Sequence, residues 1–431
     1  MKDTVKKLLA LAMASALVLS GCGGGSENSG EEKPTEGETP TTNEGGDKKE
    51  EEKKEADSGE EIKDLVMPIA ASRELETFNI LYSQRAEDFE NLTNLVDGLL
   101  EADPMGKLVP CIAEEWGTED GGLNWTFKLR EGVKWVDMNG QEKADCTAKD
   151  FATGLEWVLN FHKNDSNNTA MPIEMIKGAK EYYEYTKSLS KEEAYALKAD
   201  EGSKFFEMVG MELPDDHTII YHCITNKPYF DSLGAYNALY PMSQAMVEEL
   251  GGPEKVKSMN NENMWYNGCY TMTSYIQGNE KIFTKNPTYW DKEAKLFDTV
   301  TFKMVESNDV AFQLYQTGDV DYVQLGEAQL NTIATSESNE FHDYLVPDVP
   351  SKYSYQFIFN FNKKNEDGTP DENWNKAIAN EAFRKTWWYG LDLSNYFKRF
   401  NAINPMICEN NFYTMKGLCY TSDGTDYTEL V

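Results

Sequence analysis

The sequence is short of basic residues and of histidine. Its 431 residues include 41 Lys and Arg against 74 Asp and Glu, which gives a formal net charge of −33, and only 4 His. Proteins that bind nucleic acid or lie on anionic membranes need a basic surface, so this composition argues against both functions. The scattered histidines also argue against a zinc site, which needs closely spaced Cys and His ligands. We therefore expect no nucleic-acid partner and no metal.

Catalytic and cofactor-binding motifs are missing as well. The sequence has no GxxxxGK[ST], no GxGxxG after a strand, no HExxH and no GxSxG. Ser188–Lys191 fits the SxxK pattern of some serine enzymes, but the companion SDN and KTG strings are absent. The overlapping Ser190–Glu193 string is typical of a capping box at the start of a helix, and we favour that interpretation. The sequence thus predicts a protein that works by binding, without catalysis and without a cofactor.

Closely spaced cysteines are also absent. The seven cysteines, no two of which form a CxxC pair, are Cys22, Cys111, Cys146, Cys223, Cys269, Cys408 and Cys419. An exported protein can form disulfides, but scattered cysteines in a long chain serve equally well as small buried apolar residues. The spacing alone therefore predicts no disulfide pattern.

The N-terminus has the features of an export signal. Three lysines precede an apolar run from Leu8 to Leu19, and small residues follow it. The run has 12 residues, fewer than the roughly 20 that a membrane-spanning helix requires, so it indicates a secretory signal. The string LSGC, which ends at Cys22, resembles the lipobox of bacterial lipoproteins, in which this cysteine takes a diacylglycerol. We predict a lipoprotein signal peptide at 1–22 with lipidation at Cys22; the alternative is an ordinary secretory signal.

Residues 23–61 differ in composition from the rest of the chain. They contain 14 acidic residues and 5 lysines, almost no apolar residue and no aromatic residue. Such a segment buries too little surface to offset the entropy lost on ordering, which predicts a disordered acidic linker. Behind a lipid anchor this linker would hold a folded body a short way from the membrane. The alternative is an acidic interaction tail.

The remainder of the chain alternates between strand and helix patterns. In Trp125–Leu129 every second residue is apolar, as in a half-buried strand, whereas Phe151–Asn160 has apolar residues at helical spacing. Gly318 stands where a left-handed C-cap would end a helix, and Asn380 is a good N-cap. Strands are expected at 125–129, 218–224, 299–304, 320–323 and 353–361, and helices at 151–160, 309–316, 381–389 and 391–400. This pattern predicts an α/β fold.

Several strings, in order, resemble one family. They are AEEW (113–116), WTFKLREGVKW (125–135), TAKDF (147–151), NGCYTMTSY (267–275), NPTYWD (286–291), YQTGDVDYV (315–323) and NEAFRKTWWYGLD (380–392). Together they resemble the oligopeptide/dipeptide/nickel-type solute-binding lipoproteins, family 5, of bacterial ABC importers. Each string is weak alone, but the ordered set covers nearly the whole folded part. The segment SRELETFNI (72–80) departs from the family pattern, which has an Asp-Pro there.

The resemblance implies a two-lobed α/β fold of the periplasmic-binding-protein type (type II, cluster C), with an extra domain in the N-terminal lobe. It implies a main domain of lobe I from 62–97 and 225–350, an inserted domain at 98–224 and lobe II at 351–431. Family members usually continue beyond the position of Val431, so lobe II is expected to be incomplete at its C-terminus. The part beyond carries the carboxylate that pairs with the peptide amine in peptide-binding members.

The resemblance also places candidate ligand-binding residues. In the family, the loop after the first strand and the strand that leaves the first lobe line the cleft. The corresponding residues here are Tyr82, Gln84, Arg85 and Ala86 in the loop, and Tyr353, Tyr355 and Gln356 in the strand. Tyr and Gln offer hydrogen bonds to peptide groups, and the Arg85 guanidinium is a candidate partner for a ligand carboxylate. Core packing of the aromatic residues and an ordinary surface position for Arg85 are the alternatives.

By this resemblance the expected function is capture of oligopeptides by hinge closure and delivery to the permease subunits of an ABC importer. The protein would be a monomer anchored by lipid to the extracellular face of the bacterial cytoplasmic membrane, or periplasmic where an outer membrane exists. Other solutes, namely nickel chelates, sugars or haem, and presentation of peptide signals remain open as alternatives. A surface hydrolase is a further alternative from another class.

Overall fold

The computed structural model describes residues 63–70, 73–103, 107–346, 356–401 and 403–409, and short pieces at 413–414, 419, 421 and 425–430. The predicted signal peptide, Cys22 and the predicted linker lie outside the described residues, as do Tyr353 and Tyr355.

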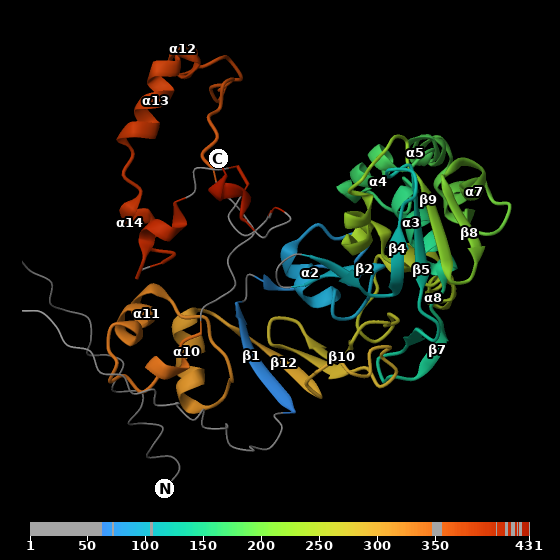
Figure 1. Cartoon of the computed structure of the whole chain (residues 1–431), viewed down its shortest axis with the longest axis horizontal. Helices are drawn as coiled ribbons and strands as arrows, with labels where there is room; N and C mark the ends of the chain where they lie inside the picture. Colours follow the sequence, from blue (N-terminus) through green and yellow to red (C-terminus); the bar gives the residue numbers. More distant parts are fainter. Residues whose placement is uncertain are drawn as a thin grey trace, which may run out of the picture. The chain divides into compact units, whose positions relative to one another are not determined.

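The first sheet joins distant parts of the sequence. Strand β1 (Asp64–Ala70) pairs in parallel with β12 (Thr299–Val305), which runs antiparallel to β11 (Glu280–Lys285); β10 (Tyr270–Ile276) pairs with β11 in turn. The strand order is β1-β12-β11-β10 (Figure 1). The chain therefore leaves this sheet after β1 and returns to it roughly two hundred residues later, which gives room for an insertion.

The second sheet lies within that insertion. Its order is β4 (Ala113–Gly117), β5 (Asn124–Leu129), β9 (Thr218–His222) and β8 (Met211–Asp215), all antiparallel. The predicted alternation in β5 is confirmed, because Trp125, Phe127 and Leu129 are all buried. Two hairpins complete the strands: β2 (Leu100–Ala102) with β3 (Leu108–Pro110), and β6 (Lys134–Val136) with β7 (Glu142–Asp145).

Helices occupy the connections. Before β10 they are α2 (Ala86–Leu92), α3 (Ala148–Leu159), η2 (Asn167–Thr169), α4 (Ala170–Met175), α5 (Ala179–Ser188), α6 (Lys191–Ala196), α7 (Lys204–Met208), η3 (Phe230–Ala235), η4 (Asn237–Leu239), α8 (Gln244–Leu250) and α9 (Pro253–Val256). After β12 they are α10 (Asn308–Thr317), α11 (Glu327–Ala334), η5 (His342–Tyr344), α12 (Glu372–Ala379), α13 (Glu381–Gly390), α14 (Ser394–Phe397), η6 (Pro405–Cys408) and η7 (Tyr427–Glu429).

Predicted helix caps are confirmed where the local sequence is decisive. Ser190 and Glu193 form the capping box of α6, which accounts for the SxxK string without a nucleophile. Gly318 ends α10 with φ 76°, the left-handed conformation that glycine adopts without a Cβ penalty. The Asn380 side chain accepts from the Ala382 N–H at the start of α13.

Three predicted elements are wrong in the described residues. Residues 356–361, the described part of the strand predicted at 353–361, form no strand: none of the described strands pairs with them, and Phe357, Ile358 and Phe361 are exposed. Residues 320–323 form no strand; instead, the Asp321 N–H donates to the Val66 carbonyl (2.8 Å) and the Val66 N–H donates to Asp321 Oδ2 (2.7 Å). One of these two bonds therefore uses the Asp321 side chain. A strand paired with β1 would use backbone groups for both bonds. The helix predicted at 391–400 is shorter in the structure, where it is α14 (Ser394–Phe397). Leu393, which precedes α14, lacks helical geometry, and the chain turns after Phe397.

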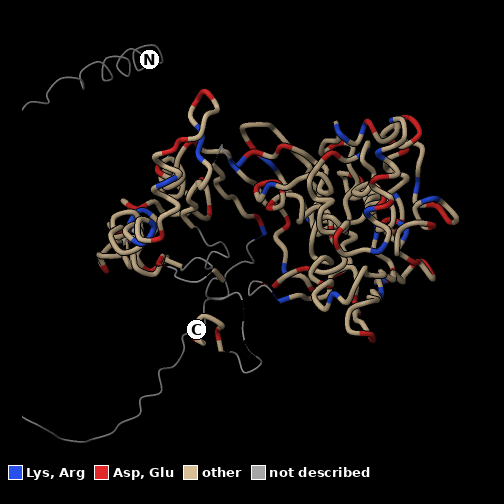
Figure 2. Tube along the Cα trace, turned by 90° about the horizontal axis from the view of Figure 1, so that it is seen from above, with Lys and Arg blue, Asp and Glu red and all other residues tan. Residues whose placement is uncertain are grey.

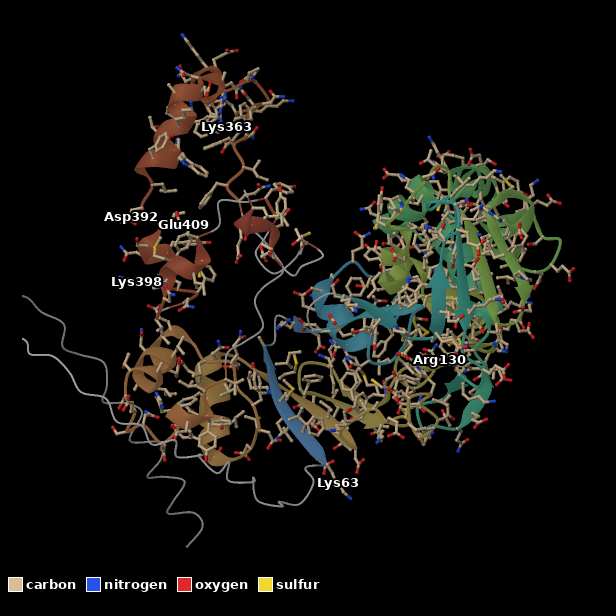
Figure 3. All side chains as sticks on the ribbon, viewed as in Figure 1. Lys63, Arg130, Lys363, Asp392, Lys398 and Glu409 are labelled. Carbon is tan, nitrogen blue, oxygen red and sulfur yellow. The ribbon has the colours of Figure 1, made fainter. Side chains whose placement is uncertain are left out.

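One continuous set of buried side chains spans both sheets. It includes Phe127 and Phe151 from the insertion and Met272 and Phe283 from the first sheet. At its margin the Arg130 guanidinium lies 4.2 Å from the centre of the Trp290 ring, so a residue of the insertion stacks on the segment after β11. Figure 3 labels Arg130 on the insertion. The insertion is therefore packed against the first sheet.

Residues 356–430 bury little of their apolar surface among the described residues. Ile378 of α12 is buried, but many large apolar side chains are exposed: Phe357, Ile358, Phe361, Trp388, Tyr389, Phe400, Ile403, Ile407 and Tyr413. Exposed apolar surface of this extent is typical of an interaction surface.

Candidate functional site

An open pocket of about 350 Å³ lies between the segment that precedes α2 and the segment that precedes η2. Its lining residues are Glu76, Thr77, Tyr82, Ser83, Gln84, Arg85, Asp88, Asp165, Ser166 and Asn167. Three of the predicted ligand-binding residues, Tyr82, Gln84 and Arg85, therefore line one pocket. Ala86 begins α2 beside it without lining it, and Gln356 is exposed in the separate 356–430 segment.

The first wall is a loop held by a buried asparagine. The Asn79 carbonyl accepts from the N–H groups of Tyr82 (3.0 Å) and Ser83 (3.2 Å), which makes a tight turn. Asn237, buried at the start of η4, donates from Nδ2 to the carbonyls of Ile80 (2.6 Å) and Ser83 (2.9 Å). Because one amide satisfies two loop carbonyls, the loop is fixed to the body of the protein.

The second wall is linked to the first by side-chain amides. Asn168 Nδ2 donates to the Leu81 carbonyl. With its amide oxygen directed toward η2, Gln84 accepts from the backbone N–H groups of Asn168 (2.6 Å) and Asn167 (3.1 Å). Gln84 thus satisfies donors at the N-terminus of a 3-10 helix. Both walls are therefore held together before any ligand binds.

Arg85 already has protein partners. Its guanidinium lies 2.8 Å from Glu76 Oε1, 3.5 Å from Glu87 Oε2 and 3.9 Å from Asp88 Oδ1, and it donates to the Glu74 carbonyl (3.3 Å). A ligand carboxylate would have to compete with these groups for the guanidinium. Arg85 thus lines the pocket as the cation of an acidic network, and its role toward a ligand stays a prediction.

Asp88 organises the floor of the pocket. It is 1% exposed, and its two oxygens accept from Ser83 Oγ (2.6 Å) and from the Glu76 N–H (2.9 Å). Its position in the first turn of α2 also suits a negative charge. Glu76, Asp88 and Asp165 also line the pocket and were not predicted from the sequence. The run of acidic residues in the first turn of α2 is a signal that could have indicated Asp88, whereas Asp165 comes close only through the fold.

Tyr82 and Asp165 both line the pocket. The negative charge of Asp165, followed by partial burial and a hydrogen bond to Asp165, raises the pKa of the Tyr82 phenol above its usual value. The phenol therefore stays neutral and can donate a hydrogen bond at physiological pH. Tyr82 is 42% exposed, so its side chain is accessible to a ligand in a pocket that also contains a carboxylate.

The other parts of the described chain contain weaker candidates for a binding site. A smaller pocket of about 110 Å³ beside α3 contains the buried pair Lys163–Glu156, with Nζ 2.6 Å from Oε2. Glu156 also accepts from Tyr182 and Asn160, so this network is satisfied within the protein. No group of three or more His, Cys, Asp or Glu suited to a metal occurs among the described residues. In the same residues no helix has the length and apolar character needed to cross a bilayer.

Lys and Arg are interspersed with acidic residues along the described part of the chain (Figure 2). Within the sequence as a whole the acidic residues predominate.

Several known proteins are similar to this chain. It is 27% identical to the oligopeptide-binding protein SarA of Streptococcus gordonii over 336 residues, which cover 76% of this chain and 47% of SarA. It is 32% identical to the periplasmic oligopeptide-binding protein OppA of Haemophilus influenzae over 233 residues, 54% of this chain and 38% of that protein. The chain thus spans about half the length of SarA.

Solved structures give the same fold. The structure of Listeria monocytogenes OppA bound to peptide matches with a TM-score of 0.59 at 19% identity, over 85% of this chain and 64% of that chain. The two-lobed periplasmic-binding-protein fold predicted from the sequence is confirmed by this likeness. Residues 107–406 match the family described as bacterial extracellular solute-binding proteins, family 5 Middle. The chain belongs to family 5 of the bacterial extracellular solute-binding proteins.

Proposed function

We propose that this protein captures oligopeptides outside the cytoplasmic membrane and delivers them to an ABC importer. The observation that carries the proposal is the pocket lined by Tyr82, Gln84 and Arg85, the loop residues expected from the family to face the ligand. Membership of the family and likeness to proteins named for oligopeptide binding support peptide as the solute. The polar lining suits the alternating donors and acceptors of a peptide main chain.

Capture would proceed by closure of two lobes. Lobe I comprises the main domain at 62–97 and 225–350 with the insertion at 98–224, and lobe II begins at 351. Tyr353, Tyr355 and Gln356 would supply the opposite wall of the cleft. Ligand binding shifts an equilibrium between open and closed forms and needs no covalent step, so the ligand is released unchanged.

The N-terminus would tether the protein as a monomer. A diacylglycerol on Cys22 would anchor the chain, and the acidic segment 23–61 would act as a flexible spacer of roughly 35 Å. The folded body would then reach the permease subunits at the extracellular face of the membrane.

Native mass spectrometry of the purified full-length protein tests the peptide assignment. We expect co-purified peptides within a narrow range of lengths, and the same peptides recovered intact after incubation. Recovery of sugars or metal chelates alone would contradict the assignment, and recovery of fragments from an intact peptide would indicate a hydrolase.

A further inference from the structure

We propose that the pocket is selective for a positively charged group of the ligand, an ammonium or a guanidinium, which it holds between the Asp165 carboxylate and the Tyr82 ring. This inference rests on the proposed function and names the chemical class of ligand for the same pocket. The inference depends on which side chains line the pocket, whereas the proposed function depends on the position of the Tyr82–Arg85 loop.

The charges that line the pocket are mainly negative. Glu76, Asp88 and Asp165 face a single cation, Arg85. Arg85 is within 4.0 Å of three carboxylates, two from the lining and one from Glu87, so its positive charge is balanced locally. A ligand in the pocket therefore experiences a net negative potential, which favours a cation and disfavours an anion.

The three carboxylates that line the pocket differ in how many hydrogen bonds and ion pairs they form within the protein. Both oxygens of Asp88 are engaged in the buried turn, and Glu76 is held by Arg85 at 2.8 Å. Asp165 is exposed, it lines the pocket together with Tyr82, and it forms no ion pair with the described residues. Asp165 is thus the lining carboxylate that a ligand cation can reach without breaking an ion pair.

Tyr82 adds a second attraction for a cation. Tyr82 is exposed and lines the same pocket as Asp165, and a cation over the face of a tyrosine ring is stabilised by the ring's quadrupole. The same ring can pack against the methylene groups of a Lys or Arg side chain. A carboxylate and an aromatic face together are a chemical combination that recognises ammonium and guanidinium groups.

Titration calorimetry with the full-length protein tests the selectivity. The probes are N-acetylated, C-amidated alanine pentapeptides with one central Lys, Gln or Glu, and the Gln peptide with a free N-terminus. The two cationic probes distinguish a side-chain cation from the α-amine. We expect at least one of them to bind tighter than the acetylated Gln peptide by about threefold, and the Glu peptide to bind weakest. Raising the ionic strength to about 1 M should reduce the differences.

Matched variants assign the effect to the pocket. Asp165→Asn should remove most of the preference for the cationic probe, whereas Glu131→Gln, which removes one exposed charge away from the lining, should keep it. Tyr82→Phe should keep more of the preference than Tyr82→Leu. Equal or tighter binding of the Glu peptide, or an unchanged preference in Asp165→Asn, would overturn this inference and leave the proposed function standing. Failure of every probe to bind would overturn both.

Discussion

Lys281, a lysine on β11 that is 1% exposed, is paired with Glu74, with Nζ 3.1 Å from Oε1. Glu74 also accepts from the N–H groups of Gly278 (2.7 Å) and Leu75 (2.9 Å). Partial burial opposes ionisation of Glu74, but the hydrogen bonds from Gly278, Leu75 and Lys281 together lower its pKa. Since the Glu74 carbonyl in turn accepts from Arg85, the β10–β11 hairpin supports the loop that lines the pocket.

Lys281→Met should therefore affect both stability and ligand binding. The substitution leaves Glu74 without its cation, and we expect a loss of about 2–3 kcal/mol in the free energy of unfolding. We also expect weaker peptide binding, because Arg85 and its loop lose their support. Chemical denaturation and calorimetry measure the two effects. Lys285→Met, on the exposed end of the same strand, is the control and should change neither; equal effects of both variants would contradict the role of the pair.

Asn237→Ala should loosen the first wall of the pocket. The substitution removes both hydrogen bonds from Nδ2 to the Ile80 and Ser83 carbonyls, so about 1–3 kcal/mol of stability should be lost. Hydrogen exchange should accelerate most in residues 80–85. Asn226→Ala, which removes a bond of an exposed asparagine to the Asp120 carbonyl, is the matched control. Uniform acceleration over the whole protein, without a local excess at this loop, would contradict the prediction.

Asp97 should make stability depend on pH. Burial raises its pKa to about 7, despite hydrogen bonds that include one from Trp290 Nε1 to Oδ2 (2.8 Å). The pKa is raised on folding, so the contribution of this group to stability is complete below about pH 4 and is lost as pH rises through about 7. Asp97→Asn keeps an acceptor for Trp290 and removes the charge.

We therefore expect Asp97→Asn to equal the wild type in stability near pH 4 and to exceed it at pH 8 by on the order of 2–4 kcal/mol. Denaturation curves at several pH values measure the difference. Asp216→Asn, at an exposed turn, should show no such trend. A difference between Asp97→Asn and the wild type that stays constant from pH 4 to pH 8 would refute the prediction.

Cys22→Ala should release the protein from the membrane. If Cys22 carries a diacylglycerol, the variant loses its anchor and is recovered in the medium or in the soluble periplasmic fraction. Incorporation of labelled fatty acid into the wild type and its absence in the variant provide the measurement. Label that persists in Cys22→Ala would place the lipid elsewhere.

The sequence predicts those elements whose cause is local. The capping box at Ser190–Glu193, the Gly318 C-cap and the alternation in β5 each depend on a few neighbouring residues, and each is confirmed. The strand predicted at 320–323 is wrong because tertiary contacts override its β propensity. Asp321 forms hydrogen bonds to β1 through its side chain as well as its backbone.

The pocket could be predicted in part. The family pattern located the Tyr82–Arg85 loop, but the acidic partners of Arg85 and the approach of Asp165 depend on the packing of the insertion. Lys281 lies roughly two hundred residues from Glu74 in the sequence. Such pairs have no local signal, because only the tertiary fold brings the two residues together.

Photo-crosslinking tests the central claim of a peptide held intact in this pocket. A bound pentapeptide that carries a benzophenone side chain is irradiated with the full-length protein, and the adduct is mapped by mass spectrometry. We expect adducts within 76–88 and 165–167 that contain the whole peptide, and their loss when unlabelled peptide is in excess. Adducts confined to other segments, or adducts that contain a cleaved peptide, would contradict the account.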